Sequence, residues 1–351
     1  MGSSVRRKYE TLDALRGVAA ILVVLFHISH AIGVVVPNGY LAVDMFFVLS
    51  GFVIAHSYDD RLSGRGGWKI LARARIIRFW PLVVLAAIIC LLKALASEIV
   101  DSASGLPISI ETSAIFASVF LLPLPVGGDN YLFPANVPLW TLALELYLSA
   151  AFALLFPLFV RRGLALTLLV SGIWLAALIA NFGSNDLGAS VSTFWGGVAR
   201  ASFGFLFGVV LCRSNIRLSV GPVLPVMLLV LFLAWPVPDE VRMIYDMAFV
   251  FVASPLIVML GASSEPQGAQ LRVAHYLGAI SFSLYMLHGP IQGGIFAAGR
   301  VLGISPLSLA IVSLVVLLIL CPLVDRLYDQ PVRKFLRRIL NSAEGARAPA
   351  G

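Results

Sequence analysis

The sequence predicts an all-α membrane protein, a bundle of about ten transmembrane helices with both termini in the cytoplasm. Of its 351 residues, 60% are hydrophobic and only 12% are charged, whereas a soluble domain carries about 25% charged residues. The mean hydropathy is +0.95, and basic residues gather in short loops between apolar runs, as in polytopic membrane proteins. These observations exclude a soluble enzyme, a secreted disulfide scaffold and a disordered chain.

Ten apolar runs come close to the roughly 20 residues that a membrane-spanning helix needs. They lie near 17–36, 40–57, 79–97, 140–160, 164–182, 194–212, 221–236, 244–261, 274–296 and 306–326. An eleventh run near 112–126 is short and ends in Pro123 and Pro125. We therefore expect a re-entrant or interfacial segment there rather than a crossing.

The basic residues support ten crossings with a cytoplasmic N-terminus, because cytoplasmic loops are enriched in Lys and Arg. All Lys and Arg residues then lie on the cytoplasmic side, apart from four: Lys93 and Arg200 within spans, and Arg242 and Arg300 outside. An eleventh crossing would move four more to the outer side: Arg161, Arg162, Arg213 and Arg217. The net charge of +7 is explained by these loops, so we expect a lipid bilayer and no nucleic acid as partner.

Residues 1–340 are predicted to form one transmembrane domain, with loops too short to hold an appended soluble domain. Residues 341–351, rich in Ala and Gly, are predicted to be a disordered tail. The first apolar run is too long for the core of a cleaved signal peptide. All three cysteines lie inside apolar runs, which indicates no disulfide framework.

Ionisable residues inside spans are costly and mark candidate functional sites. The first helix carries Arg16 at its cytoplasmic end and His27 near the midplane. Eleven residues are about three helical turns, so both side chains point the same way about 16 Å apart. The alternative is an arginine that reaches the membrane surface and a histidine that bonds a neighbouring helix.

The second and third helices add an acid and a basic pair. Asp44 lies near the outer end of the second helix, where it could also cap the helix start. Arg75 and Arg78 are three residues apart and share one face at the cytoplasmic end of the third helix. Guanidinium groups bind phosphate oxygens bidentately, although plain anchoring at the inner surface is the alternative.

The fourth and ninth helices complete the polar set. Glu145 in the fourth helix needs a cationic partner, and His27 from another helix is the obvious candidate. In the ninth helix Ser281, Tyr285 and His288 fall on one face. The alternative is that these side chains only form hydrogen bonds between helices.

Depth in the membrane separates these residues into two groups. Three arginines gather at the inner surface: Arg16, Arg75 and Arg78. The others lie from the midplane outward: His27, Asp44, Glu145, Ser281, Tyr285 and His288. A phosphate-bearing donor from the cytoplasm and a neutral polar acceptor from the far side fit this division, and carboxylate–imidazole pairs supply general-base chemistry. We expect no metal, because HExxH and CxxC spacings are missing.

Six segments between Leu12 and Lys334 form a recognisable set: LDALRGVAAILVVLFH, GYLAVDMFFVLSGF, RIIRFWP, LWTLALELY, SFSLYMLH and DQPVRK. Together they resemble the acyltransferase 3 family of integral membrane acyltransferases. Each motif alone is weak, but six in the family's order are a strong signal. Ala42 stands where the family often has Gly, and Asp329 where Glu commonly precedes the final X-Pro.

The resemblance implies ten membrane helices in the cytoplasmic (inner) membrane and transfer of an acyl group. The donor is usually acetyl-CoA and the acceptor a carbohydrate hydroxyl, as in polysaccharide modification. By position His27 resembles the essential histidine with Arg16 as its partner, while Arg75 and Arg78 resemble the pair associated with CoA. Four other residues match signature positions whose roles are less settled: Asp44, Glu145, Tyr285 and His288. Some relatives add an extracytoplasmic esterase-like domain, which we do not expect here.

The resulting hypothesis is an O-acetyltransferase in which His27, oriented by Glu145 or Asp44, removes the proton of a sugar hydroxyl. Tyr285 or Ser281 would stabilise the oxyanion or accept the acyl group transiently. The alternative is a transporter or flippase of a glycolipid or polysaccharide precursor, which the lack of inverted repeats disfavours. The acceptor sugar, the acyl length and the oligomeric state are left open.

Overall fold

The computed structural model describes residues 7–345 except 34, 65, 101–107, 127–129, 160–161 and 219. Within this part of the chain the structure is helical and contains no β-strand beyond one isolated bridge between Tyr131 and Ser190. The chain divides into two compact units. The first comprises 1–59, 158–187 and 198–282, and the second comprises 60–157, 188–197 and 283–351.

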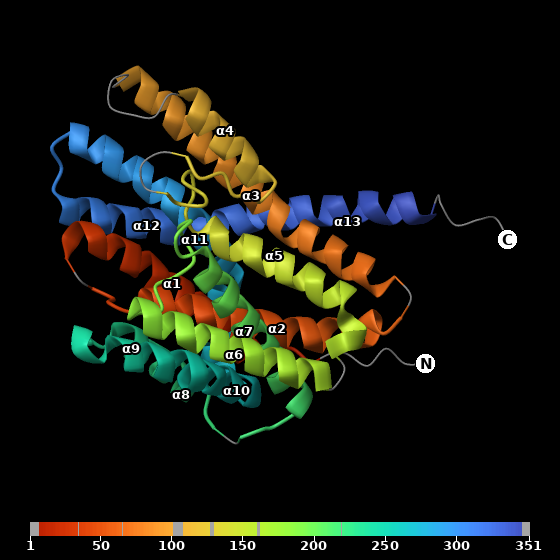
Figure 1. The fold of residues 1–351 in the computed structure, drawn as a ribbon. Helices are drawn as coiled ribbons and strands as arrows, with labels where there is room; N and C mark the ends of the chain where they lie inside the picture. The colour runs from red at the N-terminus through yellow and green to blue at the C-terminus, as the bar shows by residue number, and fades with distance from the viewer. Residues whose placement is uncertain are drawn as a thin grey trace. The chain divides into compact units, whose positions relative to one another are not determined.

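The first unit is a set of apolar helices. It holds α1 (Glu10–Ile32), most of α2 (Ala42–Leu62), α6 (Arg162–Phe182), most of α7 (Phe194–Ser214), α8 (Val223–Ala234), α9 (Asp239–Ala248), α10 (Ser254–Ser263) and the first half of α11 (Gly268–Val301). Helix α1 packs against α8 and α10, and α6 packs against α9 (Figure 1). A π-helical turn at Phe249–Ala253 joins α9 to α10.

Glycines let α2 and α7 approach to backbone contact within this unit. A Cβ added at Gly51 would lie 1.8 Å from the carbonyl oxygen of Phe205, and one at Gly208 would lie 2.0 Å from that of Val48. Small residues at helix crossings are typical of membrane proteins, where packing and not water drives helix association. The close crossing brings the start of α2, which carries Asp44, beside α7.

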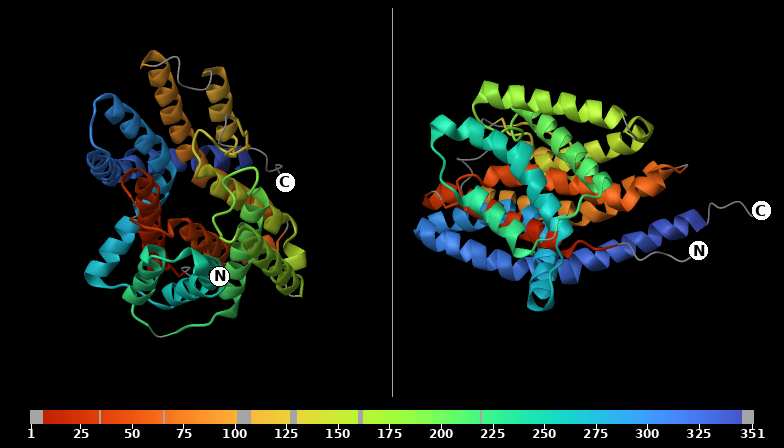
Figure 2. Two further views of the ribbon diagram at one scale, coloured as in Figure 1. Left: turned by 60° about the vertical axis from the view of Figure 1, so that its left-hand side comes forward. Right: turned by 90° about the horizontal axis from the view of Figure 1, so that it is seen from below.

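The second unit holds α3 (Gly67–Val100), α4 (Ile108–Val119), α5 (Leu139–Leu154), the second half of α11, α12 (Pro306–Val324) and α13 (Gln330–Gly345). Helix α3 packs against α4, α5 and α13, and α3 and α4 form an antiparallel pair (Figure 1). Helix α12 passes through a π-helical turn, Asp325–Asp329, directly into α13, which Figure 2 shows as one long blue segment.

The apolar runs form helices as the sequence predicts, but the count of ten crossings is not confirmed. Seven helical stretches of the described residues are long and apolar enough to cross a membrane: Glu10–Ser29, Gly39–Leu62, Gly67–Glu98, Arg162–Phe182, Phe194–Ser214, Asp239–Ser263 and Pro306–Leu340. Of the other three predicted spans, two form the shorter helices α5 and α8, and the third lies within α11. The side of the membrane on which each terminus lies stays a prediction.

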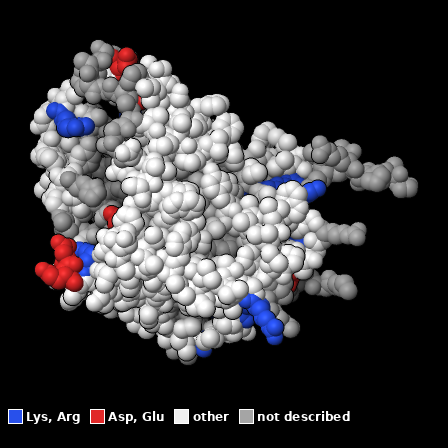
Figure 3. Space-filling model, viewed as in Figure 1, with Lys and Arg blue, Asp and Glu red and all other residues white. Residues whose placement is uncertain are grey.

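Apolar side chains also cover much of the surface, as a bilayer solvent requires. Leu166 on α6 and Ile311 on α12 are 63% and 57% exposed. On the face drawn in Figure 3, charged side chains are sparse. An exposed apolar surface of this kind is stable in lipid, because lipid tails are as apolar as the side chains.

The structure describes two segments that the sequence sets apart from the spans, all or in part. Residues near 112–126 form the end of the 12-residue helix α4 and then a non-helical stretch, too short for a crossing on its own. The predicted tail from Asn341 begins inside α13, which continues to Gly345. Residues 346–351 lie outside the described residues.

Candidate active site

In the first unit, α1 and α11 bring Arg16 and Ser281 together. The Arg16 Nε donates to the Ser281 hydroxyl at 3.2 Å, and its Nη2 donates to the carboxylate of Asp13 one turn earlier on α1. Gly17 faces the backbone of Leu277, 2.5 Å from where a Cβ would stand. Because the two helices cross so closely, Arg16 is held between a carboxylate and a hydroxyl. Asp13 lies in the motif LDALRGVAAILVVLFH of this helix, but the sequence predicted no role for it.

His27 is half-buried on α1, with its ring fixed by local contacts. The Nδ1 atom lies 2.9 Å from the carbonyl oxygen of Val23, one turn earlier, and the ring packs edge-on against Phe26 with centroids 5.3 Å apart. A carbonyl can only accept, so the neutral ring donates from Nδ1 and carries its lone pair on Nε2. That tautomer is the one a general base acting through Nε2 needs.

Asp44 forms a buried ion pair with Arg200. The guanidinium donates through Nε and Nη2 to both carboxylate oxygens, at 3.1 and 2.8 Å, and the side chains are 1% and 2% exposed. Arg200 also donates to the carbonyls of Leu187 and Tyr40. From the sequence we place Arg200 inside a span but name no partner for it. An arginine within a span indicates that an acidic partner lies nearby.

Asn185 joins this ion pair to a second buried carboxylate, Asp246. Its side chain donates to Asp44 at 3.0 Å, while its backbone N–H donates to Asp246 at 2.7 Å. Asp246 also accepts from the hydroxyls of Tyr40 and Ser184. Sequence reasoning missed this network, because Asn185 and Ser184 lie in a loop whose course cannot be read from hydrophobic periodicity.

In the second unit, α3 and α5 bring Arg75 and Glu145 together. The Arg75 Nη1 donates to the Glu145 carboxylate at 2.8 Å, and the side chains are 9% and 21% exposed. The guanidinium carbon also lies 5.4 Å from the ring centre of Phe79, one turn further along α3. Glu145 therefore has a cationic partner, as a carboxylate within an apolar helix requires. That partner is Arg75 and not His27, the candidate from the sequence.

The C-terminal DQP motif lies within electrostatic range of Arg78, the other arginine of the pair. Asp329, 1% exposed in the π-helical turn before α13, pairs with Arg333 at 2.5 Å and interacts electrostatically with Arg78. The hydroxyl of Tyr328 donates to the carbonyl of Pro81 on α3 at 3.0 Å. The π-helical turn therefore docks on α3 beside the arginine pair, and such turns are frequent at functional sites.

Tyr285 and His288 lie on the second half of α11. The Tyr285 hydroxyl contacts the Thr141 hydroxyl on α5 at 2.7 Å, and His288 Nδ1 lies 2.8 Å from the Tyr285 carbonyl. Helix α11 is continuous through 281–288, so Ser281, Tyr285 and His288 keep the shared register that their spacing predicts.

Asn136 donates a hydrogen bond to a carbonyl of α11 that a proline leaves without its helical partner. Pro290 has no N–H for the carbonyl of Met286 four residues earlier. The Asn136 side chain donates to that carbonyl at 3.0 Å.

No group of three or more His, Cys, Asp or Glu among the described residues is placed to hold a metal.

Comparisons with known proteins place these residues in a family. The acyltransferase domain that defines the acyltransferase 3 family matches residues 9–326. The chain belongs to the acyltransferase 3 family. All the site residues above lie within the matched stretch, apart from Tyr328, Asp329 and Arg333.

Three curated relatives resemble the chain. Protein 2 of the picA locus of Rhizobium radiobacter is 31% identical over 196 residues, which is 52% of this chain and the whole of that protein. The peptidoglycan O-acetyltransferase OatA of Listeria monocytogenes is 25% identical, over 93% of this chain and 56% of its own length. The exopolysaccharide production protein ExoZ of Rhizobium meliloti is 34% identical, over 44% and 45%. No solved structure matches the chain.

Proposed function

We propose that this membrane acyltransferase moves an acetyl group from acetyl-CoA to a hydroxyl of a cell-surface or lipid-linked carbohydrate. The observation that carries the proposal is the family match across residues 9–326. The named activity of OatA and the named role of ExoZ support O-acetylation of a polysaccharide. The long apolar helices support a multi-pass protein, which we place in the inner membrane.

Arg75 and Arg78 are proposed to bind the phosphates of the CoA donor. Arg75 pairs with the Glu145 carboxylate at 2.8 Å, and Arg78 interacts electrostatically with Asp329. The ion pair with Glu145 holds the Arg75 guanidinium in a fixed orientation, and guanidinium groups bind phosphate oxygens bidentately. On this proposal Glu145 positions Arg75. The sequence predicted a different role for Glu145, namely to orient His27. Arg16, held by Asp13 and Ser281, is proposed to assist with the donor.

His27 is proposed to act as the general base through Nε2. It takes the proton of the acceptor hydroxyl as the oxygen attacks the thioester carbonyl. The new C–O bond forms, the C–S bond breaks, and the proton passes from the imidazolium to the departing CoA thiolate. The Nδ1 contact with Val23 supports this role, because it keeps the lone pair on Nε2.

The remaining site residues are proposed to stabilise charge and hold the helices in place. The Tyr285 hydroxyl, paired with Thr141, and the Ser281 hydroxyl are candidates to donate to the oxyanion that develops on the carbonyl. His288 on α11 supports this region. Asp44 serves as the counter-ion of Arg200, so that its role lies in the scaffold of the first unit.

The proposal is tested with the purified protein in lipid nanodiscs, radiolabelled acetyl-CoA and a panel of saccharides. Soluble peptidoglycan strands and exopolysaccharide oligomers are the first acceptors, because relatives carry those names. We expect label to enter one of them as an alkali-labile ester. Complete absence of transfer to the panel, together with loss of the polymer itself in a deletion strain, would favour the transporter alternative.

A further inference from the structure

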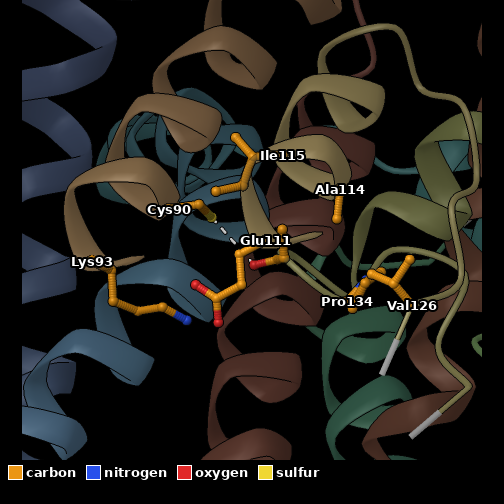
Figure 4. A pocket seen from close by; sticks show the side chains of 8 residues that line it. Cys90, Lys93, Glu111, Ala114, Ile115, Val126 and Pro134 are labelled. Carbon is orange, nitrogen blue, oxygen red and sulfur yellow. Dashed lines mark hydrogen bonds between the residues drawn. The ribbon is translucent and has the colours of Figure 1, made fainter. Parts of the chain in front are cut away.

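The second unit contains a small polar pocket that no step above uses. It has a volume of about 70 Å³ and lies between α3, α4 and the segment before α5. Figure 4 shows Lys93 and Cys90 projecting from α3 and Glu111 from α4 toward the same space. The rest of the wall is small or apolar: Ala114, Ile115, Val126, Pro134 and Ala135.

Two opposite charges, Lys93 and Glu111, face this pocket. Within the described residues, no ion pair joins the Lys93 ammonium or the Glu111 carboxylate to a partner within 4.0 Å. Both side chains are half-buried near apolar helices, where a charge without a partner is expensive. The Cys90 thiol also points here and donates to the Ala135 carbonyl at 3.2 Å. A donor, an acceptor and a backbone carbonyl therefore line one cavity.

Two buried polar side chains outside the lining of the pocket also have atoms without a hydrogen-bond partner. Among the described residues the Asn136 Oδ1 and the Gln292 Nε2 are buried and make no hydrogen bond, with the residues 3% and 7% exposed. Native structures leave few such atoms, and each calls for an explanation. Asn136 follows the wall residue Ala135 directly, and Gln292 lies on α11.

Helix α11 carries glycines where it packs against two of these polar side chains. A Cβ at Gly289 would lie 3.0 Å from the Asn136 Oδ1. A Cβ at Gly293, one turn later, would lie 3.9 Å from the Lys93 Nζ. The missing Cβ at Gly289 therefore lets α11 pack closely against the Asn136 amide.

We propose that this pocket binds one edge of the saccharide acceptor, a location for the acceptor that rests on the proposed function. A sugar hydroxyl donates and accepts at once, so it satisfies an acceptor such as Glu111 together with a donor such as Lys93. A purely anionic ligand would be repelled by Glu111, and an apolar tail would leave both charges unpaired. The volume of about 70 Å³ exceeds the space that one water needs and suits a hydroxymethyl arm, with the sugar ring at the mouth.

The first test is kinetic and uses the saccharide that accepts acetyl best. Glu111→Gln and Lys93→Met keep the side-chain length but remove the charge. Each is expected to raise the KM for the saccharide about tenfold, the loss of one hydrogen bond to a charged group, with the KM for acetyl-CoA unchanged. The matched controls Glu98→Gln and Lys69→Met alter exposed residues of α3, the helix that carries Lys93, and should leave both constants unchanged.

The second test measures binding without turnover through Cys90. Cys90 is 2% exposed and lines the pocket, so in a Cys212→Ala, Cys321→Ala background we expect the small reagent methyl methanethiosulfonate to reach it through the pocket, and the saccharide panel to slow that reaction several-fold. Protection of Cys90 without any acetyl transfer would leave the pocket standing and overturn the proposed function. Transfer with unaltered KM in both charge variants and no protection would overturn the pocket and leave the function standing. Neither transfer nor protection would overturn both.

Discussion

Asp44 and Arg200 illustrate how single residues carry the stability of the first unit. Each is almost fully buried, and each satisfies the other through two hydrogen bonds. Removal of one partner leaves a buried charge without compensation, at a cost of about 3–5 kcal/mol, whereas replacement of both by apolar residues is often neutral. We therefore expect Asp44→Leu to lower the thermal unfolding midpoint in detergent strongly, and the double variant Asp44→Leu, Arg200→Leu to recover most of the loss. A double variant no more stable than Asp44→Leu would show that the pair is needed for more than charge balance.

His27 carries the sharpest prediction for catalysis at the same scale. General-base catalysis by a positioned side chain contributes about 10²–10⁴-fold to a rate. We expect His27→Ala to lower kcat by at least about 100-fold while the KM for acetyl-CoA stays unchanged. The control is His275→Ala, which removes an exposed imidazole that pairs with Glu10. A His27→Ala protein that transfers acetyl at the wild-type rate would remove the residue from the mechanism.

The sequence predicts which buried residues need a partner of opposite charge, but it does not predict which residue that partner is. A carboxylate inside an apolar run must find a cation, and this rule singles out Asp44 and Glu145. Which cation each one meets depends on helix packing, and the structure supplies Arg200 and Arg75. Lys93 and Glu111 escaped notice as a site, because nothing in their spacing shows that α3 and α4 turn them toward one cavity.

Helix α11 shows how an element is completed by a residue from outside it. Pro290 leaves the Met286 carbonyl without its helical partner, and Asn136 supplies the missing N–H. Leaving a buried carbonyl unsatisfied costs about 1–3 kcal/mol. Asn136→Ala is therefore expected to destabilise the protein by about that amount in thermal unfolding, and Pro290→Ala, which restores the backbone N–H, should reduce the cost. Equal losses with and without Pro290→Ala would show that Asn136 acts elsewhere.

Elements were the part of the fold that hydrophobic patterning predicted best. Each of the ten apolar runs forms a helix, because a backbone in lipid has to satisfy its own hydrogen bonds. The π-helical turns at Phe249–Ala253 and Asp325–Asp329 could not be predicted, since one extra residue in a turn leaves the apolar pattern almost unchanged. The second of these turns places Asp329 near Arg78, so a local irregularity contributes to the candidate site.

At the scale of the whole molecule, the open question is whether α4 crosses the membrane. Ten crossings place the loop around Ser192 outside and the loop around Ile216 inside, and an eleventh crossing at α4 reverses both. The positive-inside rule favours ten, because Arg213 and Arg217 then lie in the cytoplasm. The length of α4, 12 residues, argues the same way, since a span needs roughly 20.

Substituted cysteines in intact cells decide between these two arrangements. Ser192→Cys and Ile216→Cys both introduce exposed thiols, and each is made in a background without Cys90, Cys212 and Cys321. A membrane-impermeant maleimide is expected to label Ser192→Cys in intact cells and to label Ile216→Cys only after the membrane is opened. The reversed pattern would make α4 a crossing, place Arg213 and Arg217 outside, and overturn the predicted orientation of every later helix.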